Sequence, residues 1–270
     1  MENLSTMEEA NTLRQRDLIS LLSTGVREDG RRLDEFRNVE VQTSLYEKAD
    51  GSAMVKIGNT VAVAGVKVEL GEPFPDTPND GVLTVSLELL PHASPSFEPG
   101  PPDEHAIEMS RIIDRGLRES KSIKYDELCV IPGKKVWVIY VDVYAMDHDG
   151  NIVDTAGLAA LAAILNAKIP EVKIDGDEVT LLDTKRPIPI VEKPIPVTVS
   201  KIGEYLLVDP SLSEESASDV KVTMTTIESG IVSSIQKSGS GPVETNDVIK
   251  IYDLAYEKGK DLRAKLEKLG

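Results

Sequence analysis

The sequence predicts an α+β fold in two successive layers, because strands precede helices twice along the chain. Apolar and polar residues alternate between 39 and 90 and again between 197 and 236, and each group precedes a segment of helical period. Four prolines occur between 183 and 196, without helical periodicity. This order favours two βα layers over a doubly wound parallel sheet. The expected units are an N-terminal helix over 1–24, a first unit over 25–185 and a second unit over 190–270.

The first unit begins with a charged segment and continues as strands. After an N-terminal helix expected over 5–23, arginines crowd the segment 25–37 around the Asp29–Gly30 turn. Guanidinium groups so close to a turn are expected to hold the loop through carboxylates or carbonyls, and phosphate binding is the alternative. Period-two patterns then predict strands over 39–45, 52–57, 60–70 and 82–90, with a loop over 71–81.

A helix expected over 102–122 carries three arginines on one face. At 100° per residue its apolar residues share one arc, and Arg111, Arg115 and Arg118 share the opposite arc at i, i+4 and i+7. Three guanidiniums on one exposed stripe are suited to gripping successive phosphates of a polyanion. The alternative is a self-paired, solvated face, because acidic residues stand three or four positions from the arginines. These residues are Glu108, Asp114 and Glu119.

The remaining elements follow from the same periodicities. Strands are expected over 128–131 and 135–146, followed by a helix over 155–168 that is apolar nearly all round and therefore buried. A hairpin over 171–182 is closed by an Asp-Gly turn. In the second unit, alternation predicts four strands before a closing amphipathic helix. Those strands are 197–201, 205–208, 220–227 and 231–236, and the helix is 244–269.

Composition narrows the classes of function. The formal net charge of −16 argues against a stand-alone nucleic-acid binder, because affinity for phosphate backbones comes mainly from positive surfaces. Binding to a polyanion would need a local basic patch or a partner. The single cysteine, Cys129, cannot form a disulfide within the chain and fits a reducing compartment, so a cytoplasmic location is expected. The polar N-terminal segment is no signal peptide, and no apolar run is long enough for a membrane span.

Metal and cofactor sites are not expected. The three histidines do not share ligand spacing, and no glycine-rich phosphate loop stands between a strand and a helix. The acidic loop at 209–219 is the closest candidate, since its carboxylates could hold Mg²⁺ or act as general acid or base. The alternative, which we favour, is a solvated loop that begins a short helix. The carboxylates are Asp209, Glu214, Glu215 and Asp219.

Several stretches together resemble the RNase PH superfamily, which consists of phosphorolytic 3′→5′ exoribonucleases. They are REDGR at 27–31, ADGSAMVKIGNT with VAVAGVK at 49–67, FEPGPPDE before the arginine helix, DGNIVDTAGLAAL at 149–161 and LLVDPSLSEES at 206–216. The resemblance implies an RNase PH-like fold with a ribosomal protein S5 domain 2-like N-terminal part and a smaller α+β C-terminal part. Within the superfamily, the chain resembles the archaeal exosome subunit that alternates with a catalytic paralogue in a hexameric ring.

Departures from the pattern of active members imply that this chain has no catalytic residues. Active members place Ser or Thr and then Arg after the DG turn, where these residues bind the attacking phosphate. Here Asp154 stands about where the Arg belongs, and a carboxylate there would repel phosphate. Active members also carry two aspartates six positions apart in the acidic loop. The loop is shorter here, so that Asp219 matches the second aspartate, but Glu215 and Ser216 stand where the first belongs.

The resemblance therefore implies a non-catalytic ring subunit. It would pair with a catalytic RNase PH-like exosome subunit, three such heterodimers would close the hexamer, and S1- or KH-type RNA-binding subunits would cap it. The arginine helix matches the helix that contacts RNA in ring-forming members, so Arg111, Arg115 and Arg118 are expected to bind RNA phosphates and position the 3′ end. One alternative is that the chain is itself a phosphorolytic exoribonuclease using Asp209 and Asp219. Another is a scaffold without RNA contact.

Overall fold

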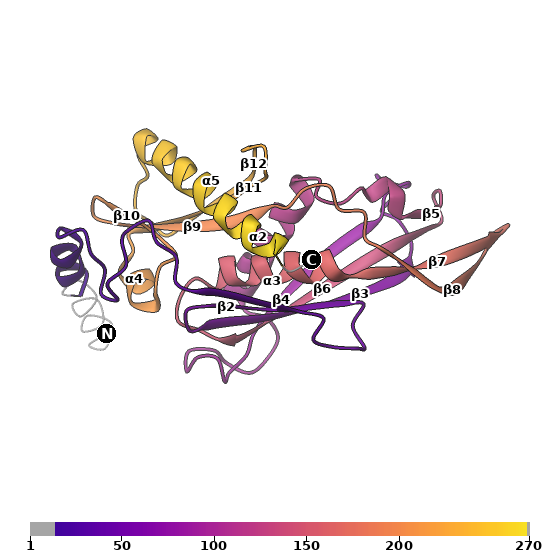
Figure 1. Cartoon of the computed structure of the whole chain (residues 1–270), viewed down its shortest axis with the longest axis horizontal. Helices are drawn as coiled ribbons and strands as arrows, with labels where there is room; N and C mark the ends of the chain where they lie inside the picture. The colour runs from indigo at the N-terminus through magenta and orange to yellow at the C-terminus, as the bar shows by residue number, and fades with distance from the viewer. Residues whose placement is uncertain (1–13, 269–270) are drawn as a thin grey trace.

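The computed structural model describes residues 14–268. Its first element is a helix over 14–22, and residues 5–13 of the expected N-terminal helix lie outside the described part. Leu18 and Leu22 of this helix pack against Ile202 and Leu207 of the second unit. The helix therefore lies at one end of the molecule (Figure 1). No helix within 14–268 is both long and apolar enough to span a bilayer.

The first sheet has the strand order β1-β2-β3-β6-β4, with β5 beside β6. Its pairs are antiparallel except that β4 runs parallel to β6. This parallel pair was not predicted. It forms because the chain crosses over through a helix between the two strands, as parallel neighbours require. The strands are β1 Val39–Thr43, β2 Gly51–Ile57, β3 Thr60–Gly71, β4 Val82–Leu89, β5 Cys129–Ile131 and β6 Lys135–Asp147.

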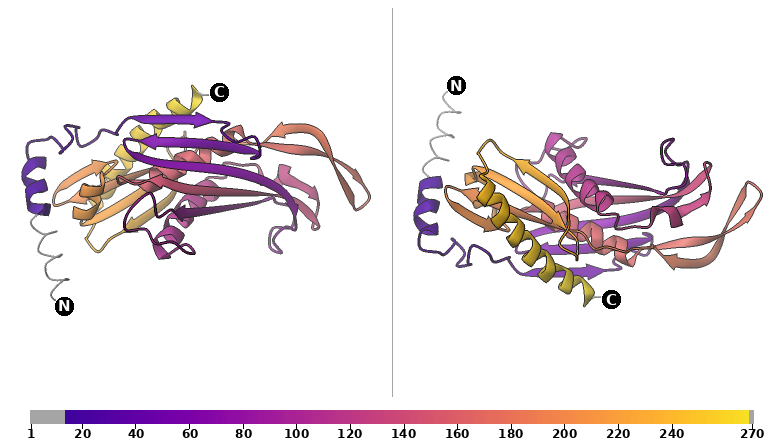
Figure 2. Two further views of the ribbon diagram at one scale, coloured as in Figure 1. Left: turned by 90° about the horizontal axis from the view of Figure 1, so that it is seen from below. Right: turned by 90° about the horizontal axis from the view of Figure 1, so that it is seen from above.

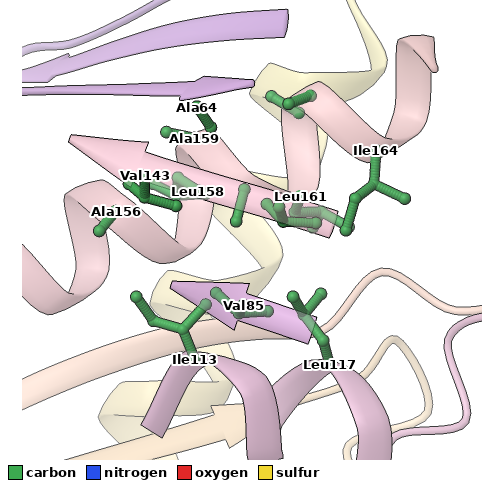
Figure 3. Packing of buried hydrophobic residues seen from close by; sticks show 14 of the residues in the cluster. Ala64, Val85, Ile113, Leu117, Val143, Ala156, Leu158, Ala159, Leu161 and Ile164 are labelled. Carbon is green, nitrogen blue, oxygen red and sulfur yellow. The ribbon is translucent and has the colours of Figure 1, made fainter. Parts of the chain in front are cut away.

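Helices α2 (Glu104–Glu119) and α3 (Ile152–Asn166) cover one face of the first sheet. Nearly every residue of α3 is buried, as its apolar sequence predicts. The helix begins at Ile152 rather than Thr155, because Asn151 takes up a left-handed backbone with φ of 57° and starts the first turn directly after Gly150. Figure 3 shows aliphatic side chains of α3 packed among side chains of the first sheet and of α2.

A long hairpin projects from the body at the end opposite the N-terminal helix (Figures 1 and 2). It consists of β7 (Lys168–Asp175) and β8 (Glu178–Pro187) and is longer than the predicted span of 171–182. Most of its side chains are exposed. An exposed hairpin has no buried face to impose alternation, so the sequence pattern does not reveal where its strands begin and end.

The second sheet follows the connecting residues 188–194, which lie within the proline-rich stretch. Its order is β10-β9-β11-β12 and all its pairs are antiparallel. A short helix, α4 (Leu212–Ala217), interrupts the acidic loop as predicted, and α5 (Thr245–Glu267) packs on β9 and β11. The strands are β9 Ile195–Ile202, β10 Tyr205–Val208, β11 Val220–Thr226 and β12 Val232–Ser238.

The layers stack as first sheet, helices α2 and α3, second sheet and α5 (Figure 1). Two helix glycines allow the close approach of the middle layers. A Cβ on Gly157 of α3 would lie 2.5 Å from Cγ of Pro196, and one on Gly116 of α2 would lie 3.0 Å from Oγ1 of Thr225. One continuous aliphatic core therefore extends through both sheets.

Candidate nucleic-acid interface

The helix that bears the arginines, α2, is fixed by a capping side chain and by burial of one face. Oδ1 of Asp103 accepts a 2.8 Å hydrogen bond from the backbone N–H of Ala106, which ends the preceding proline-rich loop and begins the helix. The predicted apolar arc faces the core, so the arginines have to face away from it. The buried residues of that arc are Ile112, Ile113, Gly116 and Leu117.

The side chains of Arg111, Arg115 and Arg118 are all exposed, and only part of the alternative self-paired surface forms. Nη2 of Arg118 lies 2.8 Å from Oδ2 of Asp114, which is the i,i+4 pair that the spacing suggests. Within residues 14–268, Arg111 and Arg115 have no acidic partner within 4.0 Å and donate no hydrogen bond. Their guanidinium groups are therefore open to an external anion.

Glu108, the residue that spacing would pair with Arg111, instead bonds to β12. Its Oε1 accepts hydrogen bonds from Nε2 of Gln236 at 3.1 Å and from Oγ of Ser238 at 2.9 Å. These donors lie 128 and 130 residues away along the chain, so helical spacing alone could not show them.

Helix α2 and strand β12 border a pocket of about 160 Å³. Arg111 and Arg115 supply the positive charge of the α2 wall, which also contains Ile112 and Glu108. The opposite wall consists of uncharged side chains of β12, namely Ser234, Ile235 and Gln236. Two cations of α2 thus face uncharged side chains of β12, and Glu108 is the acidic residue of the lining, so a phosphate backbone can approach the arginines without an opposing negative wall. We call this feature the α2–β12 groove.

Asp154, in the first turn of α3, is fully buried and belongs to the contact between α3 and β9. Its Oδ2 accepts 2.9 Å hydrogen bonds from the N–H of Thr198 and from Nδ2 of Asn151, and its Oδ1 lies 2.7 Å from Oγ1 of Thr198. Burial raises the pKa of Asp154 to about 7, although these hydrogen bonds oppose the rise. This buried carboxyl therefore fastens α3 to β9, a structural role that its spacing in the sequence did not predict.

Asp209 follows β10 with a left-handed backbone, φ 48°, and its side chain is fully buried. Its Oδ2 accepts from Nη1 of Arg31 at 3.0 Å and from the backbone N–H and Nε of Arg37 at 2.8 and 2.9 Å. Its Oδ1 accepts from Nη2 of Arg37 at 2.7 Å and from Nδ2 of Asn151 at 2.8 Å. Burial alone would lower the pKa of Arg37, but the hydrogen bond and charge of Asp209 raise it above its usual value.

Glu214 and Arg27 form a second buried pair, with side chains 2% and 0% exposed. Nε of Arg27 donates to Oε1 of Glu214 at 2.8 Å, and the same guanidinium bonds to the carbonyls of Val208 and Asp209. Burial would raise the pKa of Glu214, but Arg27 and the N–H of Ser211 bring it below its usual value. These contacts confirm that arginines of 25–37 hold a loop, and they show that a solvated acidic loop is wrong for Asp209 and Glu214.

Asp219, the residue matched to the second aspartate of active members, also has structural partners. Its Oδ1 accepts from Nε2 of Gln15 and its Oδ2 from the N–H of Gly203, both at 2.8 Å. Glu215 lies 3.2 Å from Nζ of Lys221. Among the residues that the structure describes, no three His, Cys, Asp or Glu side chains are arranged to hold a metal ion.

Comparisons with known proteins assign the family. The model of the 3′ exoribonuclease family, domain 1, matches residues 35–170, and that of domain 2 matches residues 193–258. The chain is also 47% identical over 270 residues to an exosome complex component Rrp42 of Thermococcus onnurineus, with 99% of each chain covered. The chain belongs to the 3′ exoribonuclease, or RNase PH, family.

Further members of the RNase PH family show the same likeness. An exosome complex component Rrp42 of Pyrococcus abyssi is 48% identical over 248 residues, with 91% of this chain and 90% of the relative covered. A solved structure described as the Archaeoglobus fulgidus exosome with RNA bound to the active site matches with a TM-score of 0.86 at 42% identity, covering 95% of this chain and 98% of the other. An archaeal exosome core matches with a TM-score of 0.83 at 38% identity, covering 97% and 99%. The expected RNase PH-like α+β fold is confirmed.

We predict that Asp154→Asn removes a pH-dependent loss of stability. Because the folded-state pKa is raised to about 7 from the ordinary 3.8, the folded protein keeps a proton that the unfolded chain releases between these values. The contribution of this carboxyl to stability therefore falls as pH rises through that window. Chemical denaturation between about pH 4 and 8 should show the free energy of unfolding of the wild type falling relative to the variant by up to about 1.4 kcal/mol per pH unit. A difference that does not change with pH would contradict the prediction.

Proposed function

We propose that this chain is a non-catalytic ring subunit of an archaeal exosome, in which a catalytic paralogue carries out phosphate-dependent 3′→5′ degradation of RNA. One observation carries the proposal. Asp154 and Asp209, which lie in the two stretches where active members hold phosphate and catalytic carboxylates, are here buried and engaged by structural hydrogen bonds. A catalytic carboxylate has to reach substrate, and these side chains do not reach solvent. Relatives named as exosome components and the likeness to exosome structures support the same conclusion.

We infer further that the chain forms a heterodimer with a catalytic RNase PH-like subunit and helps to structure its active site. Three such dimers would close a hexameric ring in the cytoplasm, capped by S1- or KH-type RNA-binding subunits. The charge of the chain supports this dependence on partners. The net charge of the chain is −16, and its proposed RNA contacts are confined to the arginines of α2. Other subunits therefore have to supply most of the affinity for RNA.

The proposed RNA contacts are made by Arg111 and Arg115, whose guanidiniums are exposed at the α2–β12 groove without acidic partners among the described residues. They would bind successive phosphates without reading sequence, and so guide the 3′ end toward the partner's catalytic site. Arg118 shares its guanidinium with Asp114, so we assign it the weakest of the three contacts.

The proposed lack of exoribonuclease activity is tested by incubating the purified chain alone with single-stranded oligo(A), Mg²⁺ and inorganic phosphate. We expect no release of nucleoside diphosphates, whereas the complex with the catalytic subunit should release them. Release by the chain alone that Asp219→Ala abolishes would show that the chain is itself a phosphorolytic exoribonuclease.

We predict that Arg111→Ala combined with Arg115→Ala weakens RNA binding by the assembled complex roughly tenfold or more at low salt, because two charge-assisted phosphate contacts disappear. The slope of log K against log salt should become shallower by about 1.4, since each phosphate contact to a single strand contributes about 0.7. Fluorescence anisotropy with a labelled oligoribonucleotide across a salt series measures both quantities.

Lys250→Ala with Lys260→Ala is the matched control, because it removes the same charge from exposed positions of α5, on the other side of the second sheet. It should change affinity far less than the arginine variant. If both variants weakened RNA binding equally, the loss of affinity in the arginine variant would come from the change in net charge and not from specific phosphate contacts. Unchanged binding and degradation in the arginine variant would identify the subunit as a scaffold that does not touch RNA.

A further inference from the structure

Glu108 stands where it could close the α2–β12 groove, yet it does not do so. It lies three residues before Arg111 on the same helix, the spacing at which acidic and basic side chains meet, and it lines the same groove. Its carboxylate is instead bound by two neutral donors of β12, Gln236 and Ser238. We propose that Gln236 and Ser238 are positioning residues for RNA binding, which hold Glu108 away from Arg111 and so keep the groove available to phosphate.

The geometry of β12 suits this role. Gln236 and Ser238 are two residues apart on one strand, so their side chains leave the same face of the sheet. Both reach Oε1 of Glu108, at 3.1 and 2.9 Å. Their register is set by pairing with β11, where Gln236 lies opposite Thr223 and Ser238 lies opposite Lys221. The positions of the two donors are thus built into the second sheet and do not depend on α2.

The same helix contains an internal comparison. Asp114 stands four residues before Arg118, and within 14–268 no neutral side chain donates a hydrogen bond to it. It forms the ion pair with Arg118 at 2.8 Å. Glu108 has neutral donors and forms no such pair with Arg111. The acidic residue that has β12 donors forms no ion pair on the helix, and the one that lacks them does. We therefore expect Glu108 to turn toward Arg111 once its hydrogen bonds to β12 are removed.

Neutral donors matter because a cationic partner for Glu108 would itself alter the charge of the groove. An amide and a hydroxyl satisfy the carboxylate and leave the arginine charges in place. If Glu108 paired with Arg111, an incoming phosphate would have to displace a carboxylate from the same guanidinium. The inference rests on the proposed RNA role of the groove and adds what sets the strength of binding there.

The test uses the full-length protein assembled with its catalytic ring partner. Gln236→Leu with Ser238→Ala should weaken binding of a single-stranded oligoribonucleotide about two- to fivefold at low salt, the range of an exposed ion pair that has to be broken. The slope of log K against log salt should become shallower by up to about 0.7, one phosphate contact. Adding Glu108→Gln to this double variant removes the competing charge and should restore the affinity of the wild type. Glu108→Gln alone should bind RNA at least as tightly as the wild type.

The outcomes separate this inference from the proposed function. If Glu108→Gln fails to rescue the β12 variant, the two donors do not act through Glu108 and the inference is wrong. If the β12 variant binds as the wild type while Arg111→Ala with Arg115→Ala weakens binding, the groove binds RNA but Glu108 needs no restraint. If neither variant changes binding, the proposed RNA role of the groove fails as well. Thermal melting of each assembled variant verifies that the second sheet is intact.

Discussion

Replacing Glu214 by alanine is expected to lower the free energy of unfolding by about 3–5 kcal/mol, because the change leaves the guanidinium of Arg27 buried without its counter-charge. The pair has almost no exposed surface, so water cannot replace the lost carboxylate. Glu214 also accepts from the N–H of Ser211 and so closes the capping box of α4. Its loss would therefore loosen the short helix as well. Denaturant unfolding near neutral pH measures the change.

Glu215→Ala is the matched control, since Glu215 is the next residue of the same helix. Its partner Lys221 lies at 3.2 Å and is 35% exposed, so water can solvate the lysine once the carboxylate is removed. We expect a loss of under about 1 kcal/mol. If the two variants lost the same stability, the Arg27–Glu214 pair would contribute no more than a surface ion pair.

Asp209→Asn is expected to destabilise the protein by a similar amount, about 3–5 kcal/mol, although the two side chains have nearly the same shape. Each carboxylate oxygen accepts hydrogen bonds from at least two donors on Arg31, Arg37 and Asn151. An amide nitrogen in either place would set a donor against these donors. Asparagine tolerates the left-handed backbone at this position, so the loss reports on charge and hydrogen bonding rather than on backbone strain.

Asp149→Asn provides the control for that variant. Oδ2 of Asp149 lies 3.8 Å from Nη1 of the same Arg37, but the Asp149 side chain is 40% exposed. Its carboxylate accepts from Nδ2 of Asn59, which an amide oxygen can still do. The loss of stability should stay below about 1 kcal/mol. If both variants lost similar stability, the loss would come from removing any negative charge near Arg37, and the buried hydrogen bonds of Asp209 would contribute nothing further.

The two buried pairs bear directly on function. They join the segment that contains Arg27, Arg31 and Arg37 to the loop after β10. Exoribonuclease activity through Asp209 would require substrate to displace these arginines, with the loss of stability just described. A carboxylate that is buried and bonded to two arginines cannot reach substrate to act as a general acid or base. The stability measurements and the activity assay therefore test the same assignment from two directions.

Much of α2 could be predicted from the sequence. Helical spacing placed its apolar arc toward the core and its arginines toward solvent, since a helix that packs on a sheet has to bury its apolar side. The nearly all-apolar composition of α3 likewise indicated burial, and the structure places α3 between the two sheets. The crowded arginines of 25–37 indicated a pinned loop, but the sequence did not name Glu214 and Asp209 as the groups that pin it.

The predictions that failed concern partners brought together from distant parts of the chain. We favoured a solvated loop at Asp209, but the structure buries this residue. The residues that enclose it, Arg31 and Arg37, stand 178 and 172 residues earlier in the chain. Asp154 could be matched to a family position, but spacing could not show that its carboxyl points at Thr198 of β9. The length of the β7–β8 hairpin was underestimated because its exposed strands lack a buried face.

Local sequence patterns were enough to predict which side of each helix meets the core, where strands and turns alternate, and that three arginines share one exposed face. These properties follow from periodicity, which depends only on neighbouring residues. Which charges neutralise one another depends on how the elements pack in three dimensions. It buried Asp209 among Arg31, Arg37 and Asn151, and it bound Glu108 to β12 while leaving Arg111 open. Sequence spacing could not show these pairs, because the strength of a charge pair depends on distance and burial, and both are set by packing between elements far apart in the chain.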